Sequence, residues 1–453
     1  MTRWGRQPTA PTPTQPSVSR ANPPLSPVYP FNDPVYPFND PGQPIVLHDG
    51  PIGGLATTDV PGVVELSCVP VLNLAWRIMH SSGTGNVGDE VTLLLRRPGG
   101  DVHLPGVRRE SDEGWSNGAE IGKADAPLKR IVTHWFNLPD FHAGLGRWET
   151  ETDGWKITVD VRPDHDRVWT DLHRTHVYVM THVMELRRAD EATFTAAEAE
   201  PVLTALHVGI SFALGYWAAP VLPVGEGANG EVVWASWRVP HCDPARVTSP
   251  GWWDQRRTSL ADFLDRVIKA FADPDRLPAL RLQMMMGISA INDRGFVEQR
   301  VMMGAAGLEH IMWQIMVLGG RMSEDQYLGR GPHRCRGPQA HDLLRTVLTD
   351  AQIPIDIDAQ LLPVIATFVA ERAQYGAVLD GPDVVTQIRN RLVHPKAEQE
   401  RVYRLDGLVA EVWLLARHYL VLLILHSLGY QGSYRDMRKL RGFAGDVDKV
   451  PWA

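Results

Sequence analysis

The stretch QIRNRLVHP, residues 387–395, places Arg389, Asn390 and His394 within six residues. The pKa of a histidine side chain lies near neutrality, so an imidazole can take a proton from a ribose 2′-hydroxyl or give one to a leaving oxygen. An arginine presents a fixed fork of N–H donors that matches a phosphate and stays charged while a phosphorane forms. These residue types at this spacing indicate metal-independent cleavage of RNA.

A purely structural explanation of the same residues stays open. Cationic side chains in the last turn of a helix interact favourably with the helix dipole, and an arginine and a histidine this close together occur by chance in many proteins. In an unbroken helix, Arg389 and His394 would point about 140° apart. Because Pro395 disfavours α geometry at the preceding residue, we expect the helix to end near His394 and both side chains to reach one groove.

Apolar residues recur at helical spacing from about residue 256 onward, which predicts an all-α region over residues 256–453. The motif lies on a short helix, DVVTQIRNRLVH, with Asp383 in position to cap its first turn. Five longer helices are predicted, with the sequences TSLADFLDRVIKAF, LPALRLQMMMGISAIN, FVEQRVMMGAAGLEHIMWQIMVL, AQLLPVIATFVAERAQYG and GLVAEVWLLARHYLVLLILHSL. Arg417 and His418 interrupt the last of these, so we expect it to be a buried core helix and not a membrane span.

The motif and its surroundings resemble those of HEPN domains. In that family an arginine and a histidine separated by four to six residues form the ribonuclease motif, often with a polar residue such as asparagine after the arginine. Upstream, WASWRVPHCDPARVTSPGWWDQ and FADPDRLPALRLQMMMGISAINDRGFVEQRVMMGAAGLEHIMW are similar to ApeA-type anti-phage proteins, which join a β-rich amino-terminal region to a carboxy-terminal HEPN domain. The resemblance covers roughly residues 190–430 and is diffuse except at the motif.

The resemblance implies an endoribonuclease toxin of the abortive-infection type. It would act as a homodimer without metal or cofactor and leave a 2′,3′-cyclic phosphate and a 5′-hydroxyl. Arg389 would stabilise the transition state, Asn390 would orient or bind the phosphate, and His394 would be the acid and base. Arg391 falls at a variable position and is at most an RNA contact. We expect the ribonuclease to be inactive until the amino-terminal region senses a trigger, such as one derived from a phage, because a constantly active ribonuclease would harm its own cell.

Other functions remain open from the sequence. One is a non-catalytic HEPN module that binds RNA or a nucleotide, and another is an adaptor that works only through the β-rich region. A third is the toxin of a toxin–antitoxin pair, held by a second protein. No P-loop, dinucleotide fingerprint, GxSxG elbow or HExxH motif occurs, so the corresponding ATPase, oxidoreductase, hydrolase and zincin functions have no support.

Two further groups of residues could support the chemistry. Glu298 and Glu309 lie eleven residues apart and share one stripe of a predicted helix, where either carboxylate could hold Arg389 or simply bridge helices or face water. Arg334 and Arg336 lie in the Gly- and Pro-rich stretch LGRGPHRCRGPQAH and could grip RNA phosphates. The same stretch lacks a C-x2-C pair, so it is a poor match to a structural zinc site.

The region from 45 to 255 is predicted to be β-rich. Short runs of β-branched and aromatic residues, separated by Gly, Pro and Asp, are typical of an antiparallel sheet or sandwich, with one helix near residues 195–215 that begins at Thr195. The run HVYVMTHVMEL, residues 176–186, is expected to form one of the strands, with His176, Tyr178 and His182 on one face. We therefore predict an α+β multidomain protein with a β-rich region followed by an α-helical bundle.

Residues 1–44 contain twelve prolines and the tandem repeat VYPFNDP–VYPFNDP, and we predict a disordered tail. The repeat is either a recognition ligand with aromatic anchors or a duplication without a function. The whole chain of 453 residues has 44% hydrophobic and 22% charged residues and a net charge of −8, so nucleic acid could bind only at a local patch. Three scattered cysteines and an amino terminus without an apolar stretch favour the cytoplasm.

Overall fold

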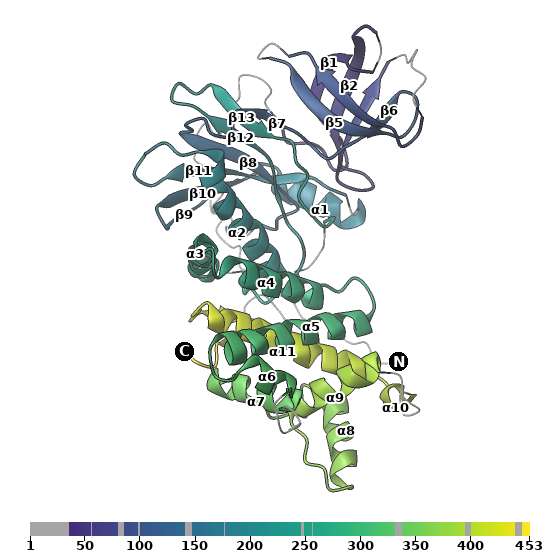
Figure 1. Cartoon of the computed structure of the whole chain (residues 1–453), viewed down its shortest axis with the longest axis vertical. Helices are drawn as coiled ribbons and strands as arrows, with labels where there is room; N and C mark the ends of the chain where they lie inside the picture. The colour runs from purple at the N-terminus through teal and green to yellow at the C-terminus, as the bar shows by residue number, and fades with distance from the viewer. Residues whose placement is uncertain are drawn as a thin grey trace, which may run out of the picture.

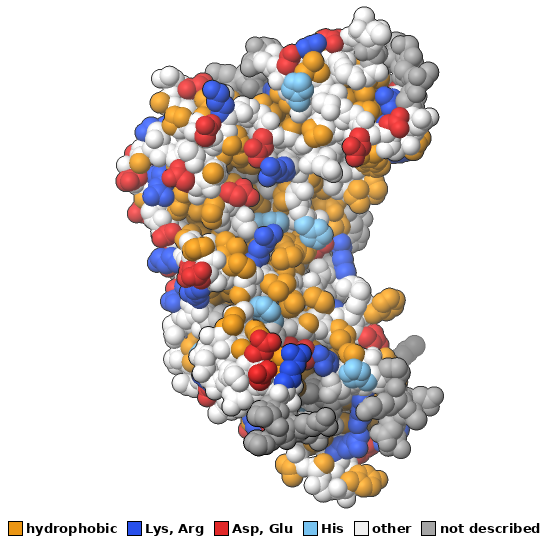
Figure 2. Space-filling model, in the orientation of Figure 1, with side chains coloured by type: hydrophobic (Ala, Val, Ile, Leu, Met, Phe, Trp, Pro, Cys, Tyr) orange, Lys and Arg blue, Asp and Glu red, His pale blue; other side chains and the backbone are white. Residues whose placement is uncertain are grey.

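A computed structural model describes residues 36–453, except for 56, 80–85, 98–99, 141–146, 176, 246–248, 256, 331–337, 395–399 and 440–445. Its strands lie mostly in the amino-terminal part and its helices mostly in the carboxy-terminal part (Figure 1). At this level the predicted fold class is confirmed. Figure 2 shows hydrophobic side chains gathered at the waist between the two parts, and acidic, basic and histidine side chains together on the helical part.

The first six strands form a closed antiparallel barrel in the order β1-β2-β3-β6-β5-β4. They are β1 (Ile45–Gly53), β2 (Val60–Ser67), β3 (Asn73–Ile78), β4 (Glu90–Leu95), β5 (Val102–Arg108) and β6 (Glu113–Ser116). Alternate residues point inward, and Leu74, Trp76 and Leu104 are almost completely buried. The sequence predicted these strands as a sheet or sandwich; closure into a separate barrel is a finding of the structure.

A seven-stranded antiparallel sheet follows, in the order β7-β13-β12-β8-β11-β10-β9. Its strands are β7 (Glu120–Gly122), β8 (Arg130–Phe136), β9 (Arg147–Thr152), β10 (Trp155–Val161), β11 (Met180–Arg188), β12 (Pro220–Glu226) and β13 (Val232–Ser236). Ile131 and Trp135 of β8 face the helices, whereas Val132 and Phe136 belong to the cluster shared with the barrel. Both faces of the sheet are therefore covered, and the helix-facing core continues without a break into the helical part.

The predicted helix near 195–215 is confirmed as α2 (Ala196–Leu214). Thr195 caps it in a reciprocal capping box with Glu198, and Gly215 ends it at a left-handed φ of 74°. A second helix, α1 (His165–Thr175), was not predicted, and the strand expected over residues 176–186 begins only at Met180. Val168 and Leu172, spaced one helical turn apart, bury one face of α1.

The helical part contains more helices than the sequence indicated. They are α3 (Arg257–Ala272), α4 (Leu277–Ile291), α5 (Val297–Trp313), which continues as a π-helical turn over Gln314–Leu318, α6 (Glu324–Leu328), α7 (Ala340–Asp350), α8 (Pro363–Ala373), α9 (Gly381–Val393), α10 (Glu400–Tyr403) and α11 (Leu408–Ser427). The short α6, α7 and α10 were not predicted. A small hairpin of β14 (Ser433–Tyr434) and β15 (Asp448–Lys449) closes the chain.

Helix α11 is the centre of the helical part, in contact with α4, α5, α8 and α9. By length and composition, two helical segments among the described residues, 297–318 and 408–427, could cross a membrane. However, 89% of the second segment's most apolar window is buried inside the protein, as expected for a core helix. Trp252 packs against Phe212, Phe263 and Tyr430 at the junction of the two parts.

The predicted disordered tail is too long by at least nine residues. The structure describes the chain from Tyr36 onward, with Tyr36 and Asn39 buried at 2% and 7% exposure between the barrel and the sheet. The prediction failed because it judged this segment by its proline content, whereas Tyr36 and Asn39 have partners far along the chain. The first VYPFNDP copy, residues 28–34, lies outside the described residues.

Candidate active site at the end of helix α9

Helix α9 is held in place at its start by an acidic pair and one arginine. Asp380 is the N-cap residue and forms a reciprocal capping box with Asp383. The Arg345 guanidinium of α7 contacts both carboxylates, with Nε 2.6 Å from Asp380 Oδ2 and Nη2 2.9 Å from Asp383 Oδ2. The sequence had assigned the cap to Asp383, which instead occupies the third helical position. α7 and α9 are thereby locked together.

The two carboxyl groups of this box differ in pKa. Burial alone would raise the pKa of Asp380, but hydrogen bonds from Arg345 and from the Asp383 N–H outweigh it, so its pKa is lowered. Burial and the neighbouring Asp380 raise the pKa of Asp383. The pKa of Arg345 itself is raised, chiefly by its hydrogen bond to Asp380. The cluster thus keeps its arginine charged at the base of the helix that carries the motif.

At the other end of α9, Arg389 is joined to the neighbouring helix α5. Its Nη2 lies 2.5 Å from Oε1 of Glu309, and its Nη1 donates to Asn390 Oδ1 over 3.0 Å. The Arg389 side chain is 23% exposed, and its Nε is buried without a hydrogen-bond partner among the described residues. The expectation that a carboxylate of the α5 stripe holds Arg389 is met by Glu309.

His394 is the residue at which the helix ends. Its N–H donates to the Asn390 carbonyl over 2.9 Å, while its φ of −107° and ψ of 98° are already extended. The expected helix end is confirmed, and the His394 side chain is exposed. Arg389, Asn390 and His394 therefore lie within the last turn and a half of one helix, with Glu309 against the first of them.

The remaining sequence candidates lie apart from this centre or outside the described residues. Glu298 accepts a hydrogen bond of 3.1 Å from the hydroxyl of Tyr403 in α10 and does not contact the motif. The guanidinium carbon of Arg391 lies 5.7 Å from the ring centroid of Phe368 in α8, so Arg391 turns toward a different helix from Arg389. Arg334 and Arg336 fall among the residues that the structure does not describe. Within the described part of the chain, no cluster of His, Cys, Asp or Glu could hold a metal ion.

Two tyrosines near the α5 carboxylates were missed by the sequence analysis. Burial, together with Glu309, raises the pKa of Tyr327 in α6. Burial and a hydrogen bond to Glu298 raise the pKa of Tyr403, whose side chain is 56% exposed. Both tyrosines therefore stay protonated at neutral pH and can act as hydrogen-bond donors. No sequence signal pointed to them, because α6 and α10 are too short to show a periodic pattern.

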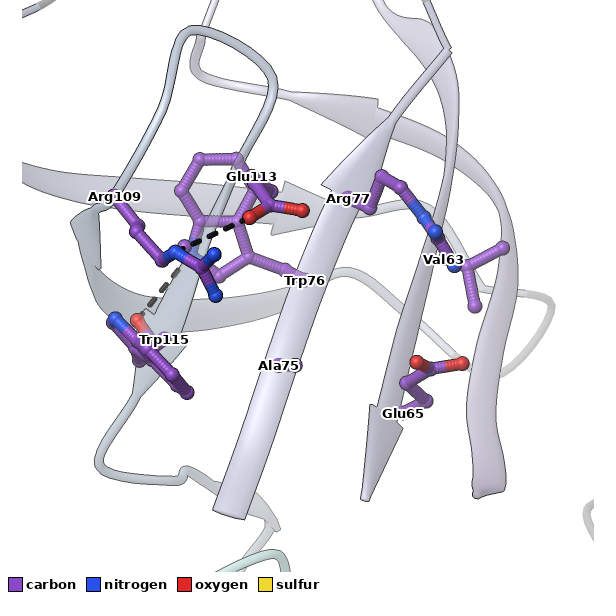
Figure 3. A pocket seen from close by; sticks show the side chains of 9 residues that line it. Val63, Glu65, Ala75, Trp76, Arg77, Arg109, Glu113 and Trp115 are labelled. Carbon is purple, nitrogen blue, oxygen red and sulfur yellow. Dashed lines mark hydrogen bonds and ion pairs between the residues drawn. The ribbon is translucent and has the colours of Figure 1, made fainter. Parts of the chain in front are cut away.

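A second candidate site lies on the outside of the barrel (Figure 3). Trp115 is 41% exposed, and the guanidinium carbon of Arg109 lies 5.4 Å from its ring centroid. Arg109 Nε also pairs with Glu113 Oε1 at 3.4 Å. Together with Glu65 and Arg77, these residues border a cavity of about 90 Å³. An aromatic ring beside charged groups of both signs is suited to a small polar ligand or a peptide.

Two family models match separate regions of the chain. Residues 123–248 match the YopA central domain, and residues 282–447 match the YopA C-terminal domain. The first match covers most of the seven-stranded sheet with α1 and α2, and the second covers most of the helical part, including α9 and the motif. The barrel lies outside both matched regions.

The chain is also similar to a curated protein over most of its length. It is 28% identical over 424 residues to the SPbeta prophage-derived uncharacterized protein YopA of Bacillus subtilis (strain 168). The aligned region covers 87% of this chain and 91% of that protein. No solved structure matches the chain.

Proposed function

We propose that the protein is a metal-independent endoribonuclease whose active site is the Arg389–Asn390–His394 cluster, carried by a HEPN-like helical bundle. One observation carries the proposal: Glu309 fixes the Arg389 guanidinium beside Asn390, one turn before an exposed histidine at a helix end. A positioned cation and a solvent-accessible imidazole are the two groups that cleavage assisted by the 2′-hydroxyl requires.

In the proposed reaction, His394 takes the proton of a ribose 2′-hydroxyl, and the 2′-oxygen bonds to phosphorus. The bond from phosphorus to the 5′-oxygen breaks, and that oxygen takes a proton from a second, protonated imidazole, so the products are a 2′,3′-cyclic phosphate and a 5′-hydroxyl. Arg389 neutralises the charge that grows on the non-bridging oxygens, and the Asn390 amide orients the phosphate. A phosphate that binds Arg389 has to compete with Glu309, so the carboxylate also lowers the affinity of the site for the phosphate of the substrate.

A homodimer would complete this chemistry. The attacking and leaving oxygens lie on opposite sides of phosphorus, so a single imidazole is poorly placed to accept one proton and deliver the other in the same step. A second copy would supply a second His394 across the interface. Val393 precedes His394 in the chain and is 39% exposed, and Tyr403 contacts Glu298 of α5 and is 56% exposed. Exposed side chains of this kind are suited to a contact between two copies.

We place this activity in anti-phage defence by abortive infection, with the amino-terminal part as the sensor of a phage-derived trigger. The related protein is described as prophage-derived, and a role in contests between phages and their hosts fits that origin. The cavity beside Trp115 on the barrel supports the sensor role, because it offers a ligand surface at a distance from the motif. The same cavity favours the second candidate function, a non-catalytic adaptor that binds a ligand through the barrel.

The two functions can be separated in living cells. The wild type, His394→Ala and Arg389→Ala are expressed in a heterologous bacterium with and without phage challenge, and RNA ends that carry 5′-hydroxyls are sequenced. The ribonuclease predicts new 5′-hydroxyl ends and growth arrest with the wild type alone. Matched controls are His103→Ala, at an exposed position on β5, and Arg404→Ala, at an exposed ion pair, and both should behave as the wild type. An adaptor predicts the same response from all five proteins once the trigger is engaged.

A further inference from the structure

Residues 36–41, from the second copy of the repeat VYPFNDP, pack between the barrel and the seven-stranded sheet. We call residues 28–34 copy one and residues 35–41 copy two; copy two is described from Tyr36 onward. We call its binding site the heptapeptide groove. It is formed by side chains or backbone groups of Cys68, His134, Arg162, Tyr178, Met180 and Trp237. His134 lies in β8 and Met180 begins β11, whereas the other four residues directly follow β2, β10 or β13 or precede β11.

The aromatic residues of copy two occupy the apolar part of the groove. The Tyr36 hydroxyl accepts a hydrogen bond of 2.8 Å from Trp237 Nε1, and the Tyr36 ring stands edge-on to His134 with centroids 6.4 Å apart. Phe38 is edge-on to the same imidazole at 6.1 Å, and the Arg162 guanidinium carbon lies 5.0 Å from its centroid. Because Tyr36 has both ring and hydroxyl contacts, the groove distinguishes tyrosine from other aromatic residues at this position.

Asn39 is recognised through its side-chain amide and its backbone carbonyl. Its Oδ1 accepts a hydrogen bond of 2.9 Å from the Met180 N–H, and its Nδ2 donates to the Tyr178 carbonyl at 3.4 Å. Its backbone carbonyl accepts a bond of 3.0 Å from Arg162 Nη1. Only an amide of this length offers both a donor and an acceptor to neighbouring backbone groups, so aspartate or leucine would leave buried groups unpaired. The groove therefore selects a peptide by its sequence and not only by its apolar side chains.

The turn that follows copy two distinguishes the two copies. The Gln43 N–H donates to the Asp40 carbonyl over 2.9 Å, and Gly42 within this turn has a φ of 76°. A Cβ at Gly42 would also lie 2.8 Å from a methyl carbon of Val69. The residue at the same place after copy one is Val35, and a β-branched residue is strongly disfavoured at positive φ. Copy one can offer the same tyrosine, phenylalanine and asparagine, but not the same turn.

We propose that the heptapeptide groove is a sequence-specific peptide-binding site and that copy one of the same chain is its second, weaker ligand. When copy two leaves the groove, copy one takes its place at the high local concentration that a short tether provides. The chain between the groove and β1 then gains seven residues, which can add roughly 25 Å of reach. The exchange thus lengthens the connection between the groove and the barrel, while the groove stays occupied by copy one.

The test uses the full chain with either copy disabled. Copy one is disabled by Tyr29→Ala with Asn32→Ala, and copy two by Tyr36→Ala with Asn39→Ala. The readout is hydrogen exchange of the Met180 amide, which donates to Asn39 Oδ1. We expect no change when copy one is disabled and a fall in protection of about tenfold when copy two is disabled. Disabling both should cost at least a further tenfold. Val35→Gly should restore protection to the chain with copy two disabled, because it relieves the turn.

A labelled VYPFNDPG peptide provides the second measurement. It should bind the chain with both copies disabled, and a peptide with alanine in place of asparagine should bind at least tenfold more weakly. If copy two alone accounts for all of the protection, so that disabling it equals disabling both, the proposal is wrong. Light scattering gives the mass of the variant with copy two disabled. If the Met180 amide of this variant is protected only when the mass is doubled, the proposal is also wrong, because the ligand would then come from a second chain. If the alanine variants unfold, Asn32→Asp and Asn39→Asp replace them.

Discussion

Glu309 of α5 holds Arg389 of α9 through a contact of 2.5 Å between Oε1 and Nη2. Their ion pair joins a helix near the waist of the molecule to the helix that carries His394. It fixes the arginine in advance of substrate and offsets its charge, so the pair sets both the position and the phosphate affinity of the proposed site.

Glu309→Gln should therefore lower RNA cleavage by roughly tenfold, because a loosely held guanidinium loses catalytic orientation. The loss should fall mainly on kcat, and KM should change little or decrease, since a phosphate no longer competes with a carboxylate for Arg389. Steady-state cleavage of a short RNA measures both constants. Glu371→Gln, which breaks the exposed pair with Arg404, is the matched control and should leave both unchanged.

Arg345→Ala should lower the free energy of unfolding by about 1–3 kcal/mol, because it leaves the partly buried carboxylates of Asp380 and Asp383 without their cation. Urea unfolding followed by circular dichroism gives the value. Arg321→Ala removes an exposed pair with Asp350 and should change the free energy by less than about 1 kcal/mol. Equal losses in the two variants would contradict the structural role given to Arg345.

Gly381→Ala should displace α9 without touching the motif. A Cβ at Gly381 would lie 2.0 Å from the Tyr419 hydroxyl oxygen of α11, so the variant should lose about 1–3 kcal/mol of stability and most of its RNA cleavage. Tyr419→Phe removes that oxygen and should recover part of both losses when the two changes are combined. A double-mutant cycle in thermal unfolding and cleavage measures this coupling. Strictly additive losses would show that the clash is not the cause.

Acid should weaken the fold through His134. Burial lowers the pKa of His134 to about 4, and neither ring nitrogen has a hydrogen-bond partner among the described residues. The folded pKa lies below the unfolded value of about 6.5, so the stability linked to this group is full above about pH 6.5 and falls as the pH drops toward 4. The loss is on the order of 3 kcal/mol.

His134→Phe should remove this dependence, because phenylalanine fills the space beside Tyr36 and Phe38 and cannot be protonated. Urea unfolding of wild type and variant at pH 7, 6, 5 and 4 provides the comparison. The two curves of stability against pH should diverge below about pH 6.5. Parallel curves would mean that other groups carry the acid sensitivity.

Local patterns predicted the parts of the fold that depend on nearby residues. The capped start of α2 at Thr195 and the end of α9 at His394 follow from single residues and a proline, and both were predicted. The Glu309 contact was one of several options for the α5 carboxylates, because helical spacing places residues on a stripe but does not identify the helix opposite.

Features set by distant contacts escaped the sequence. Asn39 is bonded to Met180, 141 residues away, and proline content gave no sign of this partner. The basic run YRDMRKLRGF is not helical over the residues that the structure describes. Arg438 pairs with buried Asp436 at 2.8 Å, and Arg435 donates to the Ser249 carbonyl. Barrel closure likewise depends on pairing between β1 and β4, which no alternation pattern specifies.

Cleavage of a defined RNA by the purified protein tests the central claim most directly. A 5′-labelled RNA and the same oligonucleotide with 2′-deoxyribose throughout are incubated in EDTA with excess wild type, His394→Ala or His103→Ala, each together with the phage-derived trigger that activates the wild type in cells. We predict products that end in a 2′,3′-cyclic phosphate from the RNA alone, and a rate about 10²–10⁴-fold lower for His394→Ala, with His103→Ala unchanged. Cleavage that is equally fast without the His394 imidazole, or that EDTA abolishes, would contradict it.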